Sequence, residues 1–358
     1  MRFADLTTLG VGGHIRHLAR WATEHELRDG FAALRDAGMP WVVVGGGSNL
    51  VASDEPWDGV VVQLTSAAIE ELARDAEGAV VRVDAGVAWD DLVRWAVERG
   101  LQGVECMSGI PGSVGAAPIQ NIGAYGQEVS DVVVEVRAFD PQAGRFVDIA
   151  AADCAFGYRT SRFRARDRGL VIVAVTLRLA VSERARLAYA ELAARFEGRA
   201  APPTLAEARE AVLAIRRGKG MVVDPADPDS RSAGSFFTNP LVDAGQLAAI
   251  EQRAEARGLG AVPRWPQPDG RVKVPAAWLI ERAGVRRGDR RGSAAVSSKH
   301  VLAIVACGDA RAADVRALAA EIRARVLETW GVTLQQEPLD LDAAAWRPER
   351  REPAEGEA

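Results

Sequence analysis

Two glycine-rich segments offer backbone that could bind a ligand directly. The first, residues 45–50 with the sequence GGGSNL, follows a β-branched run. Glycine allows positive φ angles, so successive backbone N–H groups can converge on an anion such as a pyrophosphate, but the same sequence also suits a simple tight turn. No Gly-Lys-Ser/Thr follows, and the next segment is strand-like instead of helical, so neither a P-loop nor a Rossmann fingerprint fits. A dinucleotide at this loop would therefore be bound in a different manner.

The second segment, residues 108–126 with the sequence SGIPGSVGAAPIQNIGAYG, contains five glycines and no charged residue. Backbone with so few large side chains can lie close against a large, flat, apolar ligand. A flavin ring has that shape, so the second segment is compatible with a flavin.

Three polar residues are candidates for catalysis. Each also has a structural explanation: Ser235 follows a glycine and could cap a turn, Arg159 lies in an arginine-rich stretch, and Glu337 precedes a proline. The neighbouring Arg162, Arg164 and Arg166 are expected to be solvated. Residue type alone does not decide among these interpretations.

Histidine and cysteine are sparse and scattered. The four histidines show no HxxxH or HExxH spacing, and the three cysteines are far apart without a CxxC pair. Neither a metal site nor a disulfide framework is expected, and a reducing cytoplasm fits the cysteines. His300 is left out of the catalytic candidates.

Several segments resemble one family, the UDP-N-acetylenolpyruvoylglucosamine reductases. The similarity is carried by the two glycine-rich segments and by FGYRTSRFR at 156–164. It continues through AGSFFTNP at 233–240, PAAWLIERAG at 275–284 and GVTLQQEP at 331–338, and so covers roughly residues 5–340 in matching order. A coincidental match of one motif is thereby excluded.

The resemblance implies a noncovalent FAD cofactor on an α+β domain of the vanillyl-alcohol-oxidase (PCMH) type, followed by a smaller α+β substrate domain. The first glycine loop would hold the pyrophosphate and the second would line the isoalloxazine ring. The residues that the resemblance assigns to FAD are Gly45, Gly46, Gly47, Ser48, Asn49, Leu50, Ser108, Gly109, Ile110, Pro111, Gly112, Gly115, Ala116, Gly123, Ala124 and Tyr158.

The implied reaction is NADPH-dependent reduction of UDP-N-acetylglucosamine enolpyruvate to UDP-N-acetylmuramate, with NADPH leaving before the substrate binds. The family's proton donor would be Ser235, and Arg159 and Glu337 would stabilise the intermediate. Substrate contacts are implied for Tyr125, Tyr189, Lys219 and Asn239. This chain departs from the family in having Thr238 where lysine is common and Gln335-Gln336 beside a single late glutamate.

Two other classes of function remain as alternatives. A flavin oxidase on the same FAD domain would pass its electrons to oxygen, and a nonenzymatic nucleotide-binding module would perform no turnover. Substrate-dependent NADPH consumption with little oxygen uptake would separate the reductase from the oxidase.

The elements that must position these residues can be predicted from periodicity and capping signals. Helices are expected at 23–38, 89–100, from 204 onward, and at 241–257, 275–284 and 312–331. Strands are expected at 41–44, 60–64, 79–85, 132–140, 145–149 and 170–179. The mixed order predicts an α+β architecture.

The chain has 358 residues, enough for two or three domains. We expect an FAD-binding domain at 1–182, with subdomains at about 1–66 and 67–182. A substrate loop and connecting helix at 183–234, a C-terminal domain at 235–341 and a flexible tail at 342–358 follow.

A net charge of -5 without a long basic run argues against nucleic acid as a partner. The absence of a signal-peptide-like or membrane-spanning apolar segment indicates a cytoplasmic protein, and we expect a monomer.

Overall fold

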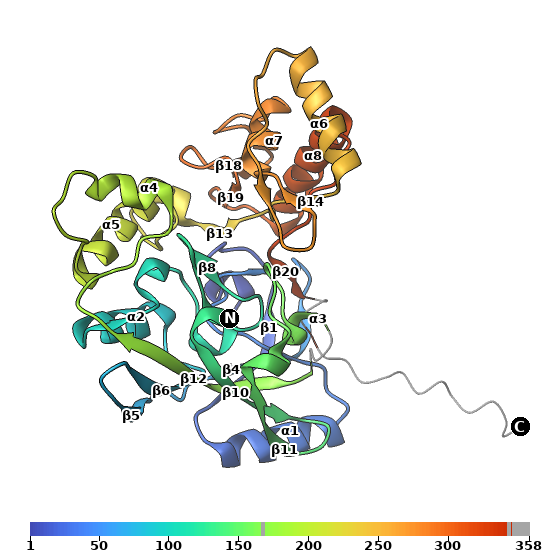
Figure 1. Cartoon of the computed structure of the whole chain (residues 1–358). Helices are drawn as coiled ribbons and strands as arrows, with labels where there is room; N and C mark the ends of the chain where they lie inside the picture. The colour runs from blue at the N-terminus through green and yellow to red at the C-terminus, as the bar shows by residue number, and fades with distance from the viewer. Residues whose placement is uncertain (166–168, 342–344, 346–358) are drawn as a thin grey trace, which may run out of the picture.

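The structure is a computed structural model, and it describes residues 1–165, 169–341 and 345 (Figure 1). A three-stranded parallel sheet lies near the N-terminus in the order β1 (Ile15–Trp21), β4 (Trp57–Leu64) and β2 (Trp41–Val43). The helix α1 (Glu24–Asp36) covers this sheet. Its apolar face buries Phe31, whose ring meets Trp41 edge to face at a centroid distance of 4.8 Å.

A larger antiparallel sheet forms the middle of the molecule. Its order is β11 (Arg145–Ala150), β10 (Val133–Asp140), β12 (Val171–Val181), β6 (Gly78–Asp84) and β5 (Ile69–Arg74), and β7 (Leu101–Gln102) pairs with the end of β12. The helix α2 (Trp89–Glu98) packs on it and buries Trp89, Leu92, Val93 and Ala96. This one-sided burial follows from the 3.6-residue spacing of those apolar side chains.

The core of the C-terminal region also takes in Leu9, Val11 and Val51 of the N-terminal region. A four-stranded sheet in the order β13 (Ser232–Ser235), β19 (Ala303–Ala306), β18 (Ala294–Val296) and β17 (Arg290–Arg291) packs against α7 (Ala276–Arg282) and α8 (Ala312–Trp330). Trp330 is buried, and its indole N–H donates to the Leu279 carbonyl at 2.9 Å. A smaller sheet contains β14 (Leu241–Val242), β16 (Val272–Lys273) and β15 (Trp265–Pro266).

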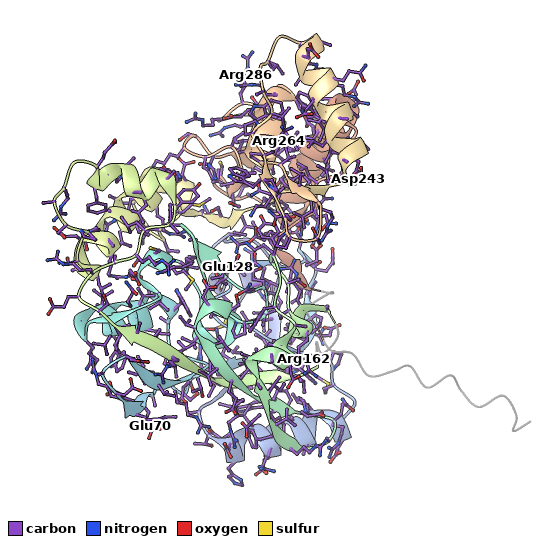
Figure 2. The ribbon with its side chains drawn as sticks, viewed as in Figure 1. Glu70, Glu128, Arg162, Asp243, Arg264 and Arg286 are labelled. Atoms are coloured by element: carbon purple, nitrogen blue, oxygen red, sulfur yellow. The ribbon has the colours of Figure 1, made fainter. Side chains whose placement is uncertain are left out.

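Asp243 caps α6 (Ala244–Ala256), which lies beside α8 at the outer edge of this region (Figures 1 and 2). In the sequence, the two large regions are joined by a segment that contains α4 (Ala190–Ala193) and α5 (Leu205–Gly218). The Thr204 side chain caps α5 by accepting from the Glu207 N–H. The remaining short elements are β8 (Gly123–Ala124), β9 (Gln127–Glu128) and α3 (Arg162–Ala165).

The last described segment returns to the first glycine-rich loop. The strand β20 (Leu339–Asp340) pairs in parallel with β3 (Leu50–Val51), which directly follows residues 45–49. This pairing brings Glu337 from the far end of the sequence to the N-terminal region.

The expected helices at 23–38, 89–100, 275–284 and 312–331 and the expected strands are confirmed with small shifts at their ends. One correction falls at 241–242, where a short strand precedes α6. The sequence-based reading misses β1 and β5, because charged residues interrupt β1 and most side chains of β5 are exposed, so neither shows a strand-like apolar pattern. The tail predicted at 342–358 lies outside the described residues apart from Ala345.

Within the described part of the chain, no helix has both the length and the apolar character needed to cross a membrane.

Candidate active site

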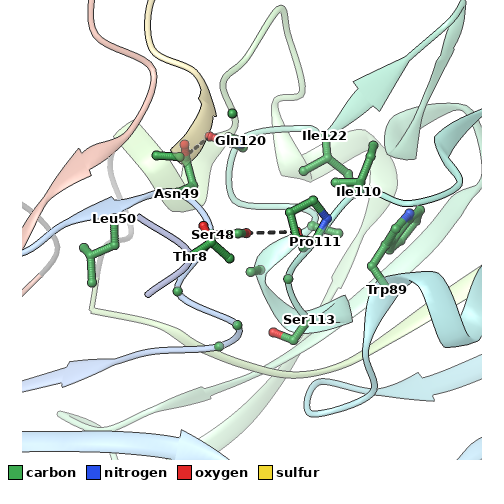
Figure 3. Close-up of a pocket in the computed structure, with 18 of the residues that line it drawn as sticks. Thr8, Ser48, Asn49, Leu50, Trp89, Ile110, Pro111, Ser113, Gln120 and Ile122 are labelled. Carbon is green, nitrogen blue, oxygen red and sulfur yellow. Dashed lines mark hydrogen bonds between the residues drawn. The ribbon is translucent and has the colours of Figure 1, made fainter. Parts of the chain in front are cut away.

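A single cavity brings the two glycine-rich segments together with the start of the C-terminal region (Figure 3). The space inside it, counted together with the open solvent at its mouth, is about 1380 Å³. Ser48 Oγ crosses between the two segments and donates to the Pro111 carbonyl at 2.9 Å. The two loops are therefore joined across the floor of one site.

The first loop depends on glycine for its close approach to neighbouring backbone. A Cβ on Gly46 would lie 2.7 Å from the Gly112 Cα, and Gly47, at φ +60°, would place a Cβ 1.9 Å from the Leu6 carbonyl oxygen. Both positions exclude any larger residue without backbone movement. Among the described residues, the backbone N–H groups of 45–49 donate to no protein acceptor. They are therefore available to a phosphate oxygen, as a pyrophosphate cradle requires.

The second segment contributes the other wall. Ile110, Pro111, Gly112, Ala116 and Gly123 all line the cavity. Gly109 adopts φ +70°, and its N–H donates to Asp90 Oδ1 at 2.6 Å. This wall is mostly apolar and carries no charged side chain, so it fits a flavin ring. The N–H groups of the first loop fit the pyrophosphate.

Not every residue assigned to FAD lies in the cavity wall. All of residues 45–50 do, whereas Ser108, Gly109, Gly115, Ala124 and Tyr158 do not. Ser108 is buried and its hydroxyl donates to the Glu105 carbonyl at 2.6 Å, and Gly115 faces Ala85.

Arg159 and Glu337 form an ion pair inside the cavity. Arg159 Nε lies 3.1 Å from Glu337 Oε1, and the two side chains are 22% and 13% exposed. The guanidinium is also held by carbonyl groups, because Nη2 donates to Gly123 O at 2.9 Å and Nη1 to Asn121 O at 3.4 Å. Arg159 itself adopts φ +53°, a strained backbone conformation for a side chain of this size.

Burial changes the chemistry of the glutamate. Removal from water raises the pKa of Glu337 above the ordinary value of a glutamate carboxyl, and nearby Arg159 and Arg164 only partly oppose this effect. A carboxyl with a raised pKa can retain a proton and donate a hydrogen bond to a developing negative charge.

Ser235 lies at the end of β13 and lines the same cavity. The preceding Gly234 has φ +70°, which turns the chain at the hydroxyl. The adjoining Phe236 accepts a hydrogen bond from the Glu337 N–H at 3.0 Å. The serine and the glutamate are therefore carried on backbone segments that are bonded to each other.

The residues implied for substrate binding form two groups outside this cavity wall. Tyr125 and Tyr189 meet edge to face at 5.5 Å between ring centroids, and Lys219 Nζ lies 5.8 Å from the Tyr125 ring centre while pairing with Glu191 at 2.8 Å. Burial raises the pKa of Tyr125 to about 12, so it stays protonated.

The other group contains Asn239 and Tyr158. The Asn239 N–H donates to the Tyr158 hydroxyl at 3.2 Å, and Asn239 Oδ1 accepts from the Ala276 N–H at 2.9 Å. Lys273 Nζ lies 4.8 Å from the centre of the Tyr158 ring, so a cation lies beside the tyrosine whose hydroxyl accepts from Asn239, the residue next to Thr238.

The structure adds residues that the sequence reading does not single out. Arg216, on the last turn of α5, is 8% exposed, lines the cavity, and donates through Nη2 to the Met221 carbonyl at 2.8 Å. Its position four residues after the buried Val212 is a signal, because it places an arginine on the apolar face of α5. Gln120 and Thr8 also line the cavity without having been distinguished by motif.

One expectation about arginines is wrong. Arg164 is not simply solvated: its guanidinium donates to the Glu337 carbonyl at 2.8 Å and to Gln120 Oε1 at 3.0 Å. Residue composition could not reveal this contact, because the three partners are far apart in sequence.

No group of three or more histidine, cysteine, aspartate or glutamate residues is placed to hold a metal ion in the part of the chain that the structure describes.

The chain matches two protein families. Residues 15–150 match the FAD binding domain, and residues 225–339 match the C-terminal domain of UDP-N-acetylenolpyruvoylglucosamine reductase. A curated protein of that name from Thermobifida fusca (strain YX) is 49% identical over 345 residues, which cover 94% of this chain and 95% of the relative. The chain belongs to the UDP-N-acetylenolpyruvoylglucosamine reductase family.

Other members give the same result. A reductase of the same name from Streptomyces coelicolor (strain ATCC BAA-471 / A3(2) / M145) is 44% identical over 95% of this chain and 89% of the relative. The solved UDP-N-acetylenolpyruvylglucosamine reductase from Thermus caldophilus aligns with a TM-score of 0.62 at 27% identity and covers 95% of this chain and 97% of its own. The family confirms the α+β fold with an FAD-binding domain, FAD as cofactor and an oxidoreductase activity, and it removes the oxidase and the nonenzymatic module as alternatives.

Proposed function

We propose that Ser235, Arg159 and Glu337 are the catalytic residues with which this family member reduces UDP-N-acetylglucosamine enolpyruvate to UDP-N-acetylmuramate. The observation that carries the proposal is their shared cavity: the Arg159–Glu337 ion pair and Ser235 line the same space as the two glycine-rich loops. The reaction belongs to peptidoglycan precursor synthesis, and NADPH is the hydride donor.

Residues 45–49 would hold the pyrophosphate of FAD through their available N–H groups, Leu50 would line the same cavity, and Ile110, Pro111 and Gly112 would lie against the flavin ring. When bound there, FAD would supply the hydride for the enolpyruvyl double bond.

The protein's own residues provide the rest of the chemistry. Hydride addition to one alkene carbon leaves enolate-like charge on the neighbouring carbon and its carboxylate. Arg159 would stabilise that charge electrostatically, and Glu337, whose pKa burial raises, would in its protonated form donate a hydrogen bond to the same group. Ser235 would then transfer its hydroxyl proton to the carbon and regain one from solvent.

The UDP portion would be bound between the two groups of residues outside the cavity wall. Tyr125, Tyr189 and Lys219 cluster on one side, and Asn239 lies on the other. A lysine suits the diphosphate as a mobile point charge, and the half-exposed Tyr189 ring is available to cover it.

We extend the proposal to the organisation of the protein. The FAD-binding domain would span 1–182, the connecting segment 183–234 and the substrate domain 235–341, and the separation of the large antiparallel sheet from the four-stranded sheet supports this division. The protein is proposed to be a cytoplasmic monomer, and its three free cysteines suit a reducing compartment. Sedimentation of the purified protein tests the monomer.

The decisive experiment separates the two half-reactions of Ser235→Ala. Mixed anaerobically with NADPH, the variant should bleach its flavin absorbance at the wild-type rate, because Ser235 has no part in that step. Added enolpyruvyl substrate should then fail to restore the absorbance. Ser293→Ala, on the same sheet region away from the cavity, is the matched control and should turn over normally. Reoxidation of Ser235→Ala at the wild-type rate would refute the assignment.

A further inference from the structure

A hydrogen-bonded network behind the cavity wall holds the main chain of Glu337. The Glu337 carbonyl oxygen accepts from Arg164 Nη2 at 2.8 Å and from Asn49 Nδ2 at 3.4 Å. Arg164 Nη1 donates to Gln120 Oε1 at 3.0 Å, and the same Gln120 oxygen accepts from Asn49, as Figure 3 shows. Arg164 therefore connects the glutamate directly to the second glycine-rich segment and, through Gln120, to Asn49 of the first.

Two backbone hydrogen bonds complete this frame. The Glu337 N–H donates to the Phe236 carbonyl at 3.0 Å, beside Ser235, and the Leu339 N–H donates to the Asn49 carbonyl at 2.9 Å. The position of the Glu337 carboxyl thus depends on contacts from three separate parts of the chain. Among the described residues, Arg164 supplies the cation that contacts the Glu337 main chain, whereas Arg159 contacts its carboxyl.

Arg164 differs from the catalytic arginine in where it acts. Arg159 and Glu337 both line the cavity, but Arg164 does not. Its positive charge nevertheless lowers the pKa of Glu337 against the raising effect of burial. The other charged or titratable groups that face this carboxyl, within the described residues, are Arg159 and Tyr158.

We propose that Arg164 is a positioning residue for the catalytic carboxyl: it clamps the Glu337 main chain to Gln120, which Asn49 also contacts, so that the carboxyl meets Arg159 in the cavity. The inference rests on the proposed role of Glu337. A guanidinium suits the task because its planar fork donates to two acceptors in fixed directions, which a lysine ammonium cannot reproduce. The contact also ties the geometry of the carboxyl to the loop proposed to hold the FAD pyrophosphate.

The test compares Arg164→Met and Arg164→Lys with a matched control, Arg162→Met. Arg162 lies on the same short helix α3 (Figure 2), and its guanidinium donates to the Asp153 carbonyl at 3.1 Å, away from Glu337. Four quantities are measured for each protein: the FAD dissociation constant, the anaerobic rate of reduction by NADPH, the rate of reoxidation by the enolpyruvyl substrate, and the pH dependence of that last rate.

Arg164→Met should slow reoxidation by about 100-fold, since displacing a reacting group by about 1 Å costs a rate factor of this size. Reduction by NADPH should be unchanged. The pH limb that reports Glu337 should move to higher pH, because removing a nearby positive charge raises the pKa of a carboxyl. Arg164→Lys should keep the wild-type pH limb but recover only part of the rate, and Arg162→Met should match wild type throughout.

The inference is overturned if Arg164→Met reoxidises as fast as Arg162→Met, or if it slows both half-reactions equally with an unmoved pH limb, which would indicate a purely structural role. Should Arg164→Met not fold, wild-type behaviour of Arg164→Lys in both rate and pH profile would overturn the need for the fork. Glu337→Gln distinguishes a failure of the proposed function from a failure of the positioning role. If Glu337→Gln reoxidises normally, the proposed function is wrong. If Glu337→Gln is impaired while Arg164→Met is normal, only the positioning role is rejected.

Discussion

The Arg159 guanidinium and the Glu337 carboxylate meet inside one cavity with 3.1 Å between Nε and Oε1. Arg159 lies within the turn between Gly157 and Thr160, beyond β11, and Glu337 arrives on the segment that leads into β20. Because burial raises the pKa of Glu337 while Arg159 lowers it, the pair balances two opposing effects on one proton. The consequences for activity and stability can be measured.

Replacing Glu337 with Gln should slow substrate-dependent flavin reoxidation by roughly 100- to 1000-fold, the usual cost of losing one preorganised group beside a developing oxyanion. In the wild type, the reoxidation rate should fall as pH rises through the raised pKa of Glu337, because the protonated carboxyl is the proposed donor. Stopped-flow absorbance across pH checks both statements. A Glu337→Gln enzyme that retains this falling limb would assign it to another group.

Gly46→Ala should weaken FAD binding, since the added Cβ would lie 2.7 Å from the Gly112 backbone and force the two loops apart. Fluorescence titration of the apoprotein with FAD measures the change. Gly218→Ala is the control: its Cβ would meet nothing within 4 Å, and alanine near the end of α5 should leave FAD affinity unchanged and stabilise the helix by up to about 1 kcal/mol. Equal affinities in the two variants would contradict the close contact between the loops.

His300 should make the fold sensitive to acid. Burial, together with the positive charges of Lys219 and Arg287, lowers its pKa to about 4 from an ordinary value of 6.5. The folded protein therefore holds this imidazole neutral, while the unfolded chain takes up a proton below 6.5. The stability from this residue is complete above pH 6.5 and is lost as pH falls toward 4.

The measurement is the melting temperature at pH 7 and pH 5 of wild type and His300→Asn, which cannot gain a proton in this range. The wild-type protein should lose more stability than the variant between the two values. Parallel losses would place the acid sensitivity elsewhere in the chain.

Thr204→Ala should remove the cap of α5, the helix that carries Arg216 and leads into Lys219. The Thr204 hydroxyl accepts from the Glu207 N–H at 3.2 Å, and losing such a cap costs about 1 kcal/mol of unfolding free energy. Thr23→Ala removes an equivalent cap from α1, also at 3.2 Å, far from the proposed substrate residues.

Chemical denaturation should give similar losses for the two variants, but only Thr204→Ala should raise the KM for the enolpyruvyl substrate. If KM rises equally in both variants, substrate binding does not depend on the N-terminal cap of α5.

Local sequence patterns determined much of this protein. The capping boxes at Thr23 and Thr204 and the apolar spacing of α2 and α8 depend on neighbours within a few residues, so helices could be located before any tertiary contact was considered. The glycine-rich segments and the ordered family motifs indicated FAD and a reductase, and the family comparison confirms both.

Only the tertiary structure decided which of the polar residues meet. β20 pairs with β3 and carries Glu337 to Arg159, and the same return places Glu337 within reach of Arg164, an arginine that composition alone assigns to solvent. Such contacts join residues from distant parts of the chain, and their geometry and burial arise only when the separate sheets pack. The raised pKa of Glu337 has the same origin, because desolvation depends on everything that surrounds the carboxyl and not on the residues next to it in sequence.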